Sequence, residues 1–83
     1  MLSNKAKKQL RGLEQEIRAR VDRLLEKLEQ EPVPYQEYDL KKLEDRDENY
    51  RVRLSSFRVV YWVRWTEKTV WIAKIERRSE NTY

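Results

Sequence analysis

Residues 50–61 decide the fold, and they read Tyr50-Arg51-Val52-Arg53-Leu54-Ser55-Ser56-Phe57-Arg58-Val59-Val60-Tyr61. Apolar and arginine side chains alternate on both sides of the two serines, and successive side chains of a strand point to opposite faces. The pattern therefore predicts two antiparallel strands joined by a two-residue turn at Ser55-Ser56. Such a turn makes one face apolar and aromatic, by pairing Leu54 with Phe57, Val52 with Val59 and Tyr50 with Tyr61.

The opposite face of the same hairpin is basic. The pairing sets Arg53 across from Arg58 and Arg51 across from Val60. Like charges directly opposite each other in a sheet are unfavourable, so folding alone does not account for them. Three arginines on one face predict an anion that arrives from outside the protein. The alternative, a solvated polar face that happens to be basic, stays open at this point.

Composition narrows the class of protein. With 83 residues, the chain has the length of one small domain, and we expect a single domain over residues 1–83. It contains neither Cys nor His, which excludes disulfides, thiolate or imidazole metal ligands and histidine acid–base catalysis. No apolar run approaches the length of a membrane span and no signal peptide is visible. We therefore expect a cytoplasmic protein with no membrane partner.

The net charge of +4 is unevenly distributed. Residues 1–49 carry 11 Lys and Arg against 12 Asp and Glu, whereas residues 50–83 carry 8 against 3. The positive excess therefore lies in the half that contains the hairpin. A basic region of this kind is typical of proteins that bind a phosphate backbone.

The first thirty residues predict two helices. Ser3 suits an N-cap position, and Gly12 is a weak helix former that favours a break. We expect helices at about residues 3–11 and 14–30, packed as a hairpin, with one long helix as the alternative. Apolar residues recur at helical spacing at Ala6, Leu10, Leu13, Ile17, Val21, Leu24, Leu25 and Leu28.

The remaining elements complete an α+β fold. Pro32 and Pro34 end the second helix. Residues 39–43 are either a short strand or an extended connection, and residues 57–65 and 69–75 are expected to be strands. The helices are the cover available for the apolar face of the sheet. We expect an N-terminal helical hairpin packed on one face of a small antiparallel β-sheet.

Taken in order, these features resemble the RelE toxin family of the RelE/ParE toxin–antitoxin superfamily, and most of all its archaeal members. The resemblance covers nearly the whole chain. Arg58, Arg77 and Tyr83 favour the RNA-cleaving branch over the gyrase-poisoning ParE branch. The resemblance rests on the helical hairpin, Glu31-Pro32-Val33-Pro34, Asp39-Leu40-Lys41-Lys42-Leu43, the strand pair at 50–61, Ile72-Ala73-Lys74-Ile75, Arg77 and Tyr83.

The resemblance implies the toxin of a type II system, with a cognate antitoxin as its partner. Members of the family are endoribonucleases that cut messenger RNA in the A site of the small ribosomal subunit. The implied reaction is attack of a ribose 2′-OH on its own 3′-phosphate, without metal or cofactor. Two alternatives stay open: a ParE-like gyrase inhibitor, and a catalytically weakened relative that only binds RNA.

The resemblance also implies roles for single residues. Arg58 matches the arginine that stabilises the scissile phosphate, Arg77 the one that protonates the leaving oxygen, and Tyr83 the tyrosine that orients the substrate. We expect Arg77 and Tyr83 to approach the basic face. Arg53 completes the expected catalytic set, and RNA binding is expected of three further residues, Arg51, Lys74 and Arg78.

Two features depart from the family pattern. Bacterial members carry lysines where this chain has Arg51 and Arg53, and arginine stays protonated, so no general base is identified. The family also opens with a strand, which is expected to be short or missing here because only Met1 and Leu2 precede the N-cap. An uncovered sheet edge would invite pairing with another copy of the chain.

Overall fold

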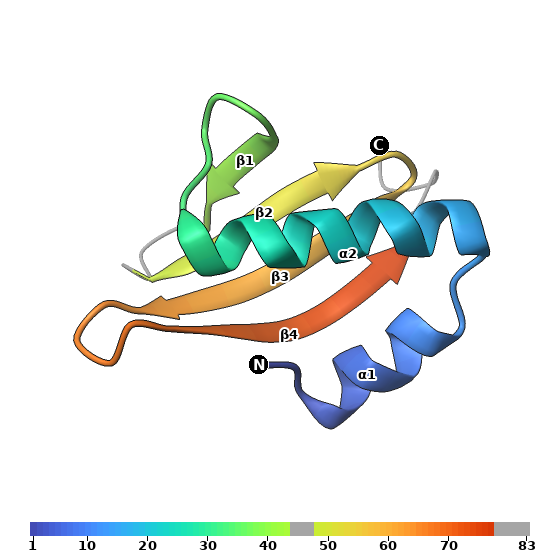
Figure 1. Cartoon of the computed structure of the whole chain (residues 1–83), viewed down its shortest axis with the longest axis horizontal. Helices are drawn as coiled ribbons and strands as arrows, with labels where there is room; N and C mark the ends of the chain where they lie inside the picture. The colour runs from blue at the N-terminus through green and yellow to red at the C-terminus, as the bar shows by residue number, and fades with distance from the viewer. Residues whose placement is uncertain (44–47, 78–83) are drawn as a thin grey trace.

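Two helices and a four-stranded sheet make up the fold. The computed structural model describes residues 1–43 and 48–77. The helices, α1 (Asn4–Arg11) and α2 (Gln15–Gln30), precede strands β1 (Asp39–Lys42), β2 (Asn49–Leu54), β3 (Phe57–Arg64) and β4 (Thr69–Arg77). These strands form an antiparallel sheet in the order β1-β2-β3-β4, and α2 lies across one of its faces (Figure 1). The predicted α+β class is confirmed, and the open question at residues 39–43 is settled in favour of a strand.

The helix boundaries follow from local signals. Ser3 is the N-cap of α1, as predicted, and its side chain accepts a hydrogen bond of 3.0 Å from the backbone N–H of Ala6. Gly12 is the C-cap of α1, and its N–H bonds to carbonyls of the last turn. The two-helix prediction is therefore confirmed. Across residues 1–43 and 48–77, neither helix is long and apolar enough to cross a membrane.

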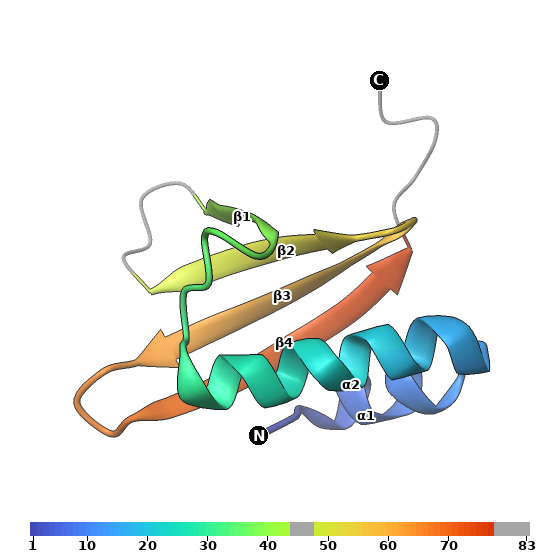
Figure 2. The same ribbon diagram turned by 45° about the horizontal axis from the view of Figure 1, so that its top comes forward.

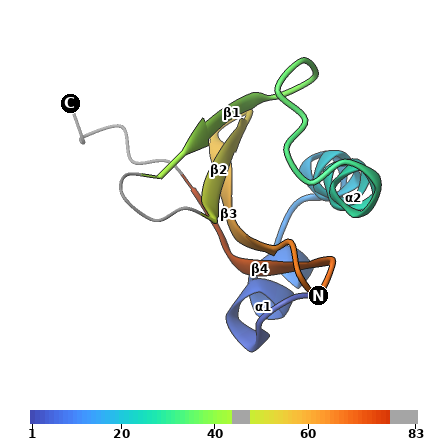
Figure 3. The ribbon, with the colours of Figure 1, turned by 90° about the vertical axis from the view of Figure 1, so that its left-hand side faces the viewer.

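One core joins both layers. Ala6, Val21, Leu24 and Leu28 contribute the helical side of this core. Both helices lie toward β4, while β1 forms the far edge of the sheet (Figure 2). Seen along the sheet, α2 lies within its curve and α1 lies next to β4 (Figure 3). The sheet contributes one face, through Tyr50, Val52, Leu54, Val59, Tyr61, Val63, Ile72 and Ile75.

The pairing of β2 with β3 has the predicted register. Leu54 pairs with Phe57, Tyr50 with Tyr61, and Arg53 with Arg58. The turn is the predicted Ser55-Ser56 pair, and Ser55 has a φ of 59°. Two-residue hairpins need this left-handed conformation at the first turn position because their twist must match that of the strands. A non-glycine residue adopts it at some energetic cost, which the paired strands offset.

The pairing of β3 with β4 contains a bulge. Val60 pairs with Lys74 and Tyr61 with Ile72, so Ala73 is an extra residue on β4. Because directly paired residues share a face, the extra residue lets both Ile72 and Ile75 reach the core. Lys74 and Glu76 then fall on the face opposite α2. The bulge therefore determines which face Lys74 occupies.

The outer edge of β4 is occupied by the N-terminal segment. Leu2 forms a parallel bridge with Ile72, flanked by hydrogen bonds from Ser3 N–H to the Ile72 carbonyl and from Ile72 N–H to the Met1 carbonyl. Further along, the Gln9 side chain accepts a 2.7 Å hydrogen bond from Ile75 N–H. The family's first strand is thus short, as expected, and this edge is largely covered. The edge at which another copy of the chain could pair is therefore β1, on the other side of the sheet.

A buried tyrosine ties the sheet to the end of α2. Tyr61 is fully buried, stacks on Tyr50 at 5.7 Å, and donates a 2.7 Å hydrogen bond to the carbonyl of Pro32. Burial, together with Tyr50 and Tyr35 nearby, raises the pKa of Tyr61 well above its usual range. The hydroxyl therefore stays protonated and acts as a donor across the physiological pH range.

We expect Tyr61→Phe to lower the free energy of unfolding by roughly 1–3 kcal/mol, because it leaves the partly buried carbonyl of Pro32 without its donor. Urea denaturation would measure the change. Tyr35→Phe is the matched control, since Tyr35 is 61% exposed. Equal stabilities for the Tyr61 and Tyr35 variants would show that the hydrogen bond to Pro32 contributes nothing.

Candidate functional site

A row of four charged residues crosses the sheet on the face opposite α2. Asp39 pairs with Arg53, Arg53 with Arg58, and Arg58 with Glu76, so each of the four strands supplies one residue. We call Asp39, Arg53, Arg58 and Glu76 the charged row. Paired strands lie about 4.8 Å apart, which keeps each side chain next to its neighbours. The predicted juxtaposition of Arg53 and Arg58 is confirmed by this register.

The two acidic ends of the row were not foreseen. The opposed arginines predicted an external anion, with a solvated basic face as the alternative. The structure places one carboxylate beside each arginine instead, on the strand further out. These two carboxylates balance part of the positive charge of the arginines. The arginine pair alone is therefore weak evidence for a bound anion. Both arginine side chains are nevertheless exposed to solvent, which leaves them accessible to an anion.

Arg58 is the residue of the row held most closely. Its Nε donates a 2.8 Å hydrogen bond to Oε2 of Glu76, and Nζ of Lys74 lies 3.4 Å from Oε1 of the same carboxylate. The side chain of Arg58 is 44% exposed, whereas that of Glu76 is 25% exposed. Glu76 therefore fixes the orientation of a guanidinium group that still faces solvent.

The electrostatics of Glu76 reflect two opposing effects. Partial burial favours the neutral acid and pushes its pKa upward, but the hydrogen bond from Arg58 and the charges of Lys74 and Arg58 outweigh that effect. The net result is a pKa below the usual value of 4.5. At neutral pH the group is a carboxylate bound to two cations.

Arg53 faces a second basic feature at the other end of the row. Its Nη1 lies 4.0 Å from Oδ2 of Asp39, a loose ion pair. A hollow of about 340 Å³ joins Arg53 to Arg20 and Arg23 of α2, with Glu37, Tyr38, Asp39 and Leu54 also lining it. Periodicity within α2 does not reveal that Arg20 and Arg23 line a hollow together with Arg53.

Of the other expected site residues, Lys74 lies beside Glu76, but Arg51 and Arg77 do not join the row. Arg51 lies on the same face but is only 9% exposed. Arg77 pairs with Phe57, and its Cζ lies 5.3 Å from the centre of the Phe57 ring. That pairing puts Arg77 on the helix-covered side of the sheet, so the expected approach of Arg77 to the basic face is wrong for this arrangement. Tyr83 and Arg78 lie outside the described residues.

The face of the charged row also carries aromatic surface. Trp62 pairs with Trp71 and is 40% exposed. Flat aromatic side chains beside cationic groups are typical of surfaces that stack nucleic-acid bases. Within the described ranges, no three acidic, histidine or cysteine side chains gather to hold a metal ion.

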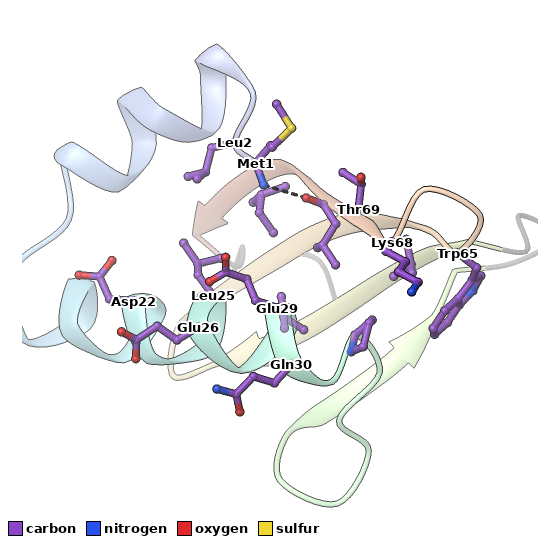
Figure 4. A pocket seen from close by; sticks show the side chains of 15 residues that line it. Met1, Leu2, Asp22, Leu25, Glu26, Glu29, Gln30, Trp65, Lys68 and Thr69 are labelled. Atoms are coloured by element: carbon purple, nitrogen blue, oxygen red, sulfur yellow. Dashed lines mark hydrogen bonds between the residues drawn. The ribbon is translucent and has the colours of Figure 1, made fainter.

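A larger hollow than the one beside Arg53 lies elsewhere. A groove of about 860 Å³ runs between α2, the N-terminal residues and the turn from β3 to β4. Figure 4 shows Asp22, Glu26 and Glu29 along α2, with Trp65 and Lys68 at the far end. Three carboxylates along one wall repel phosphate groups, so size alone does not make this groove the nucleic-acid site.

Comparisons with known proteins give a consistent family. A family model described as the ParE toxin of the type II toxin–antitoxin system parDE matches residues 1–82. The protein named "Putative toxin RelE1" from Methanocaldococcus jannaschii is 45% identical over 56 residues, which are 68% of this chain. The match spans 62% of that relative, somewhat less than two thirds of its length.

Solved structures agree with the fold. The archaeal RelE–RelB complex from Pyrococcus horikoshii OT3 contains a chain with a TM-score of 0.86 and 33% identity, covering 95% of this chain and 92% of that one. The isolated E. coli RelE toxin has a TM-score of 0.82 at 20% identity, covering 98% and 84%. The second likeness concerns the fold alone.

We expect the free energy of unfolding to decrease as the pH falls, because the pKa of Glu76 is lowered in the folded protein. A group whose pKa is lowered on folding adds stability above its unfolded pKa and loses it as the pH falls. The hydrogen bond and the charge of Arg58 lower the pKa of Glu76. Arg58→Gln should therefore raise this pKa, which is measured by NMR titration of the side-chain carboxyl carbon of Glu76. Arg64→Gln, on the same strand, serves as the control. A Glu76 titration that is identical in both variants would contradict the assigned cause.

Proposed function

The chain belongs to the RelE/ParE family of type II toxin–antitoxin systems, and from this premise we propose that it is the toxin of such a system and cleaves messenger RNA at the ribosome. The observation that carries the proposal is Arg58, an exposed guanidinium in the middle of a basic sheet face with Glu76 bound to its Nε. Cleavage then occurs in the A site, where the ribosome presents single-stranded messenger RNA to this face.

The chemistry that Arg58 supplies is electrostatic. Attack of a 2′-OH on the adjacent phosphate gathers negative charge on the phosphate oxygens, and preorganised donors stabilise such a transition state. Among the described residues, Glu76 is the one ion-pair partner of Arg58, and it uses Nε. The two Nη groups then form the fork that binds phosphate oxygens in pairs.

The surrounding residues take supporting roles in this proposal. Arg53, opposite Arg58, binds the same phosphate or its neighbour along the chain. Lys74 adds positive charge beside Glu76, and the partly covered Arg51 contributes to the potential of the face. Arg77 contacts RNA at the end of the sheet near Phe57, and Tyr83 and Arg78 act from the C-terminal residues.

The similar structures support one of the proposed partners, the antitoxin. Solved structures similar to this chain include RelE–RelB complexes of toxin and antitoxin from Pyrococcus horikoshii and E. coli. We infer a cognate antitoxin that binds this chain and suppresses its activity. The ribosome and messenger RNA are the other partners, which places the protein in the cytoplasm.

A second candidate is inhibition of gyrase, because the matching family model is described as a ParE toxin. The two functions differ in the damaged molecule. Expression of an RNA-cleaving toxin stops translation and leaves messenger RNA cut within codons, whereas gyrase poisoning breaks DNA and leaves the RNA intact. Primer extension on RNA from expressing cells separates them. Uncut messenger RNA beside broken DNA would overturn the first proposal.

Arg58→Ala should lower ribosome-dependent cleavage by about 10²–10³-fold, the usual loss when one preorganised charge-stabilising donor is removed. The measurement is single-turnover cleavage of messenger RNA on programmed ribosomes. Arg64→Ala is the matched control, because it removes an exposed arginine from the same face of β3 at its other end.

The same cleavage assay compares the contribution of Arg77 with that of Arg58. Because Arg77 lies over Phe57 and not in the charged row, we expect Arg77→Ala to lower cleavage by less than Arg58→Ala does. An Arg77 variant that is as inactive as the Arg58 variant would show that Arg77 reaches the scissile bond during the reaction.

The hollow beside Arg53 predicts a salt effect. If Arg20 and Arg23 contact RNA phosphates, Arg20→Gln with Arg23→Gln should weaken binding of a single-stranded RNA and reduce the slope of log K against log salt by about 1.4, at about 0.7 per contact. Fluorescence anisotropy across a salt series measures this slope. Replacing Lys7 and Lys8 of α1 by Gln is the charge-matched control. Equal slopes for both double variants would remove the hollow from the RNA surface.

A further inference from the structure

The proposed reaction lacks a group that takes the proton of the 2′-OH. The chain contains no His, and arginine stays protonated at neutral pH. The buried hydroxyl of Tyr61 is engaged with Pro32, on the helix side of the sheet. Among residues 1–43 and 48–77, the base is therefore sought among the carboxylates on the exposed basic face.

Glu76 is such a group, and it lies directly beside the phosphate-binding arginine. Its Oε2 accepts the 2.8 Å hydrogen bond from Arg58 Nε. Nε and the two Nη atoms belong to one rigid planar group, so the same guanidinium that binds Glu76 through Nε can bind a phosphate through its Nη atoms. The 2′-oxygen of the preceding ribose lies next to the phosphorus that it attacks. The carboxylate reaches the 2′-OH when this ribose lies between the phosphate and Glu76, because the reach of a general base is about 2.6–3.2 Å.

The charges around Glu76 permit this arrangement. A lone carboxylate would repel the incoming phosphate. Here Arg58 and Lys74 are both bound to the carboxylate, so the group of three carries a net positive charge. Each carboxylate oxygen has a second lone pair, and a quarter of the side chain remains exposed. The carboxylate can thus accept a further hydrogen bond without losing its two cations.

We propose that Glu76 is the catalytic base of RNA cleavage, a role that rests on the proposed function. A carboxylate oxygen of Glu76 takes the 2′-OH proton while the 2′-oxygen bonds to phosphorus and the bond from phosphorus to the 5′-oxygen breaks. The leaving 5′-oxygen takes a proton from solvent, and Glu76 later returns its proton to solvent. The products are a 2′,3′-cyclic phosphate and a 5′-hydroxyl, so protons and electrons balance.

The deciding variant is Glu76→Gln. Its amide oxygen still accepts the hydrogen bond from Arg58, so the arginine stays oriented, but an amide does not take up a proton. We expect single-turnover cleavage on programmed ribosomes to fall by about 10²–10⁴-fold, the usual contribution of a general base. Affinity for the ribosome–RNA complex should change by less than about threefold in the same sample. Glu67→Gln, an identical change in the exposed turn after β3, is the matched control.

The dependence on pH separates proton transfer from a structural role. The wild-type rate should fall on acidification in proportion to the ionised fraction of Glu76, whereas Glu76→Gln should lose this dependence. Glu76→Asp keeps the carboxylate but shortens its reach, so it should cleave slowly and retain the acid limb. A merely structural role would not move the profile. Thermal unfolding of each variant, followed by circular dichroism, shows that the chain remains folded.

Three results would overturn the assignment. A Glu76→Gln rate equal to wild type excludes the base while leaving the proposed function intact. A faster rate would mean that the carboxylate competes with the phosphate for Arg58. A wild-type protein that leaves messenger RNA uncut removes the proposed function, and the assignment of Glu76 with it.

Discussion

The alternation of the β2–β3 hairpin is the constraint on which the rest of the structure depends. Side chains of a strand change face at every residue, so a slip of one position would exchange the two faces completely. The two-residue turn at Ser55-Ser56 prevents that slip, at the cost of a left-handed φ at Ser55. With the register fixed, the apolar set must be covered by α2 and the arginines must remain outside. Core and candidate site are therefore two consequences of one pairing.

The same logic explains what the sequence could predict. The helices, the hairpin register and the opposition of Arg53 to Arg58 depend on local periodicity and on one short turn, and all were predicted correctly. The resemblance to the RelE family is likewise confirmed, since it rests on the same ordered segments. Short-range pattern was enough to identify the fold class and the central arginine pair.

The positions of Lys74, Glu76 and Arg77 were not predicted, because they depend on the one extra residue in β4. A regular pairing of β3 with β4 would alternate without interruption, and nothing in Ile72-Ala73-Lys74-Ile75 marks Ala73 as the bulged position. The bulge turns Lys74 and Glu76 toward the basic face and places Arg77 with Phe57. The missed acids of the charged row have a similar origin. Asp39 reaches Arg53 only because β1 pairs with β2, and the sequence left that strand undecided.

The charge balance of the row bears on how a phosphate would enter it. The row holds two carboxylates and two guanidinium groups, so the fold itself tolerates the opposed arginines. Ion pairs of this kind, partly exposed to solvent, contribute about 0–1 kcal/mol each, whereas a phosphate on an arginine fork is held by two charge-assisted hydrogen bonds. The loose 4.0 Å pair at Arg53 is accordingly the easier one to exchange for a ligand. At Arg58 the shorter bond to Glu76 uses Nε, and no other described residue forms an ion pair with Arg58, so a phosphate could bind the two Nη atoms without displacing the carboxylate. The two arginines therefore differ in how they would bind a phosphate. Arg53 is suited to exchange Asp39 for the phosphate, whereas Arg58 is suited to bind the phosphate while it keeps Glu76.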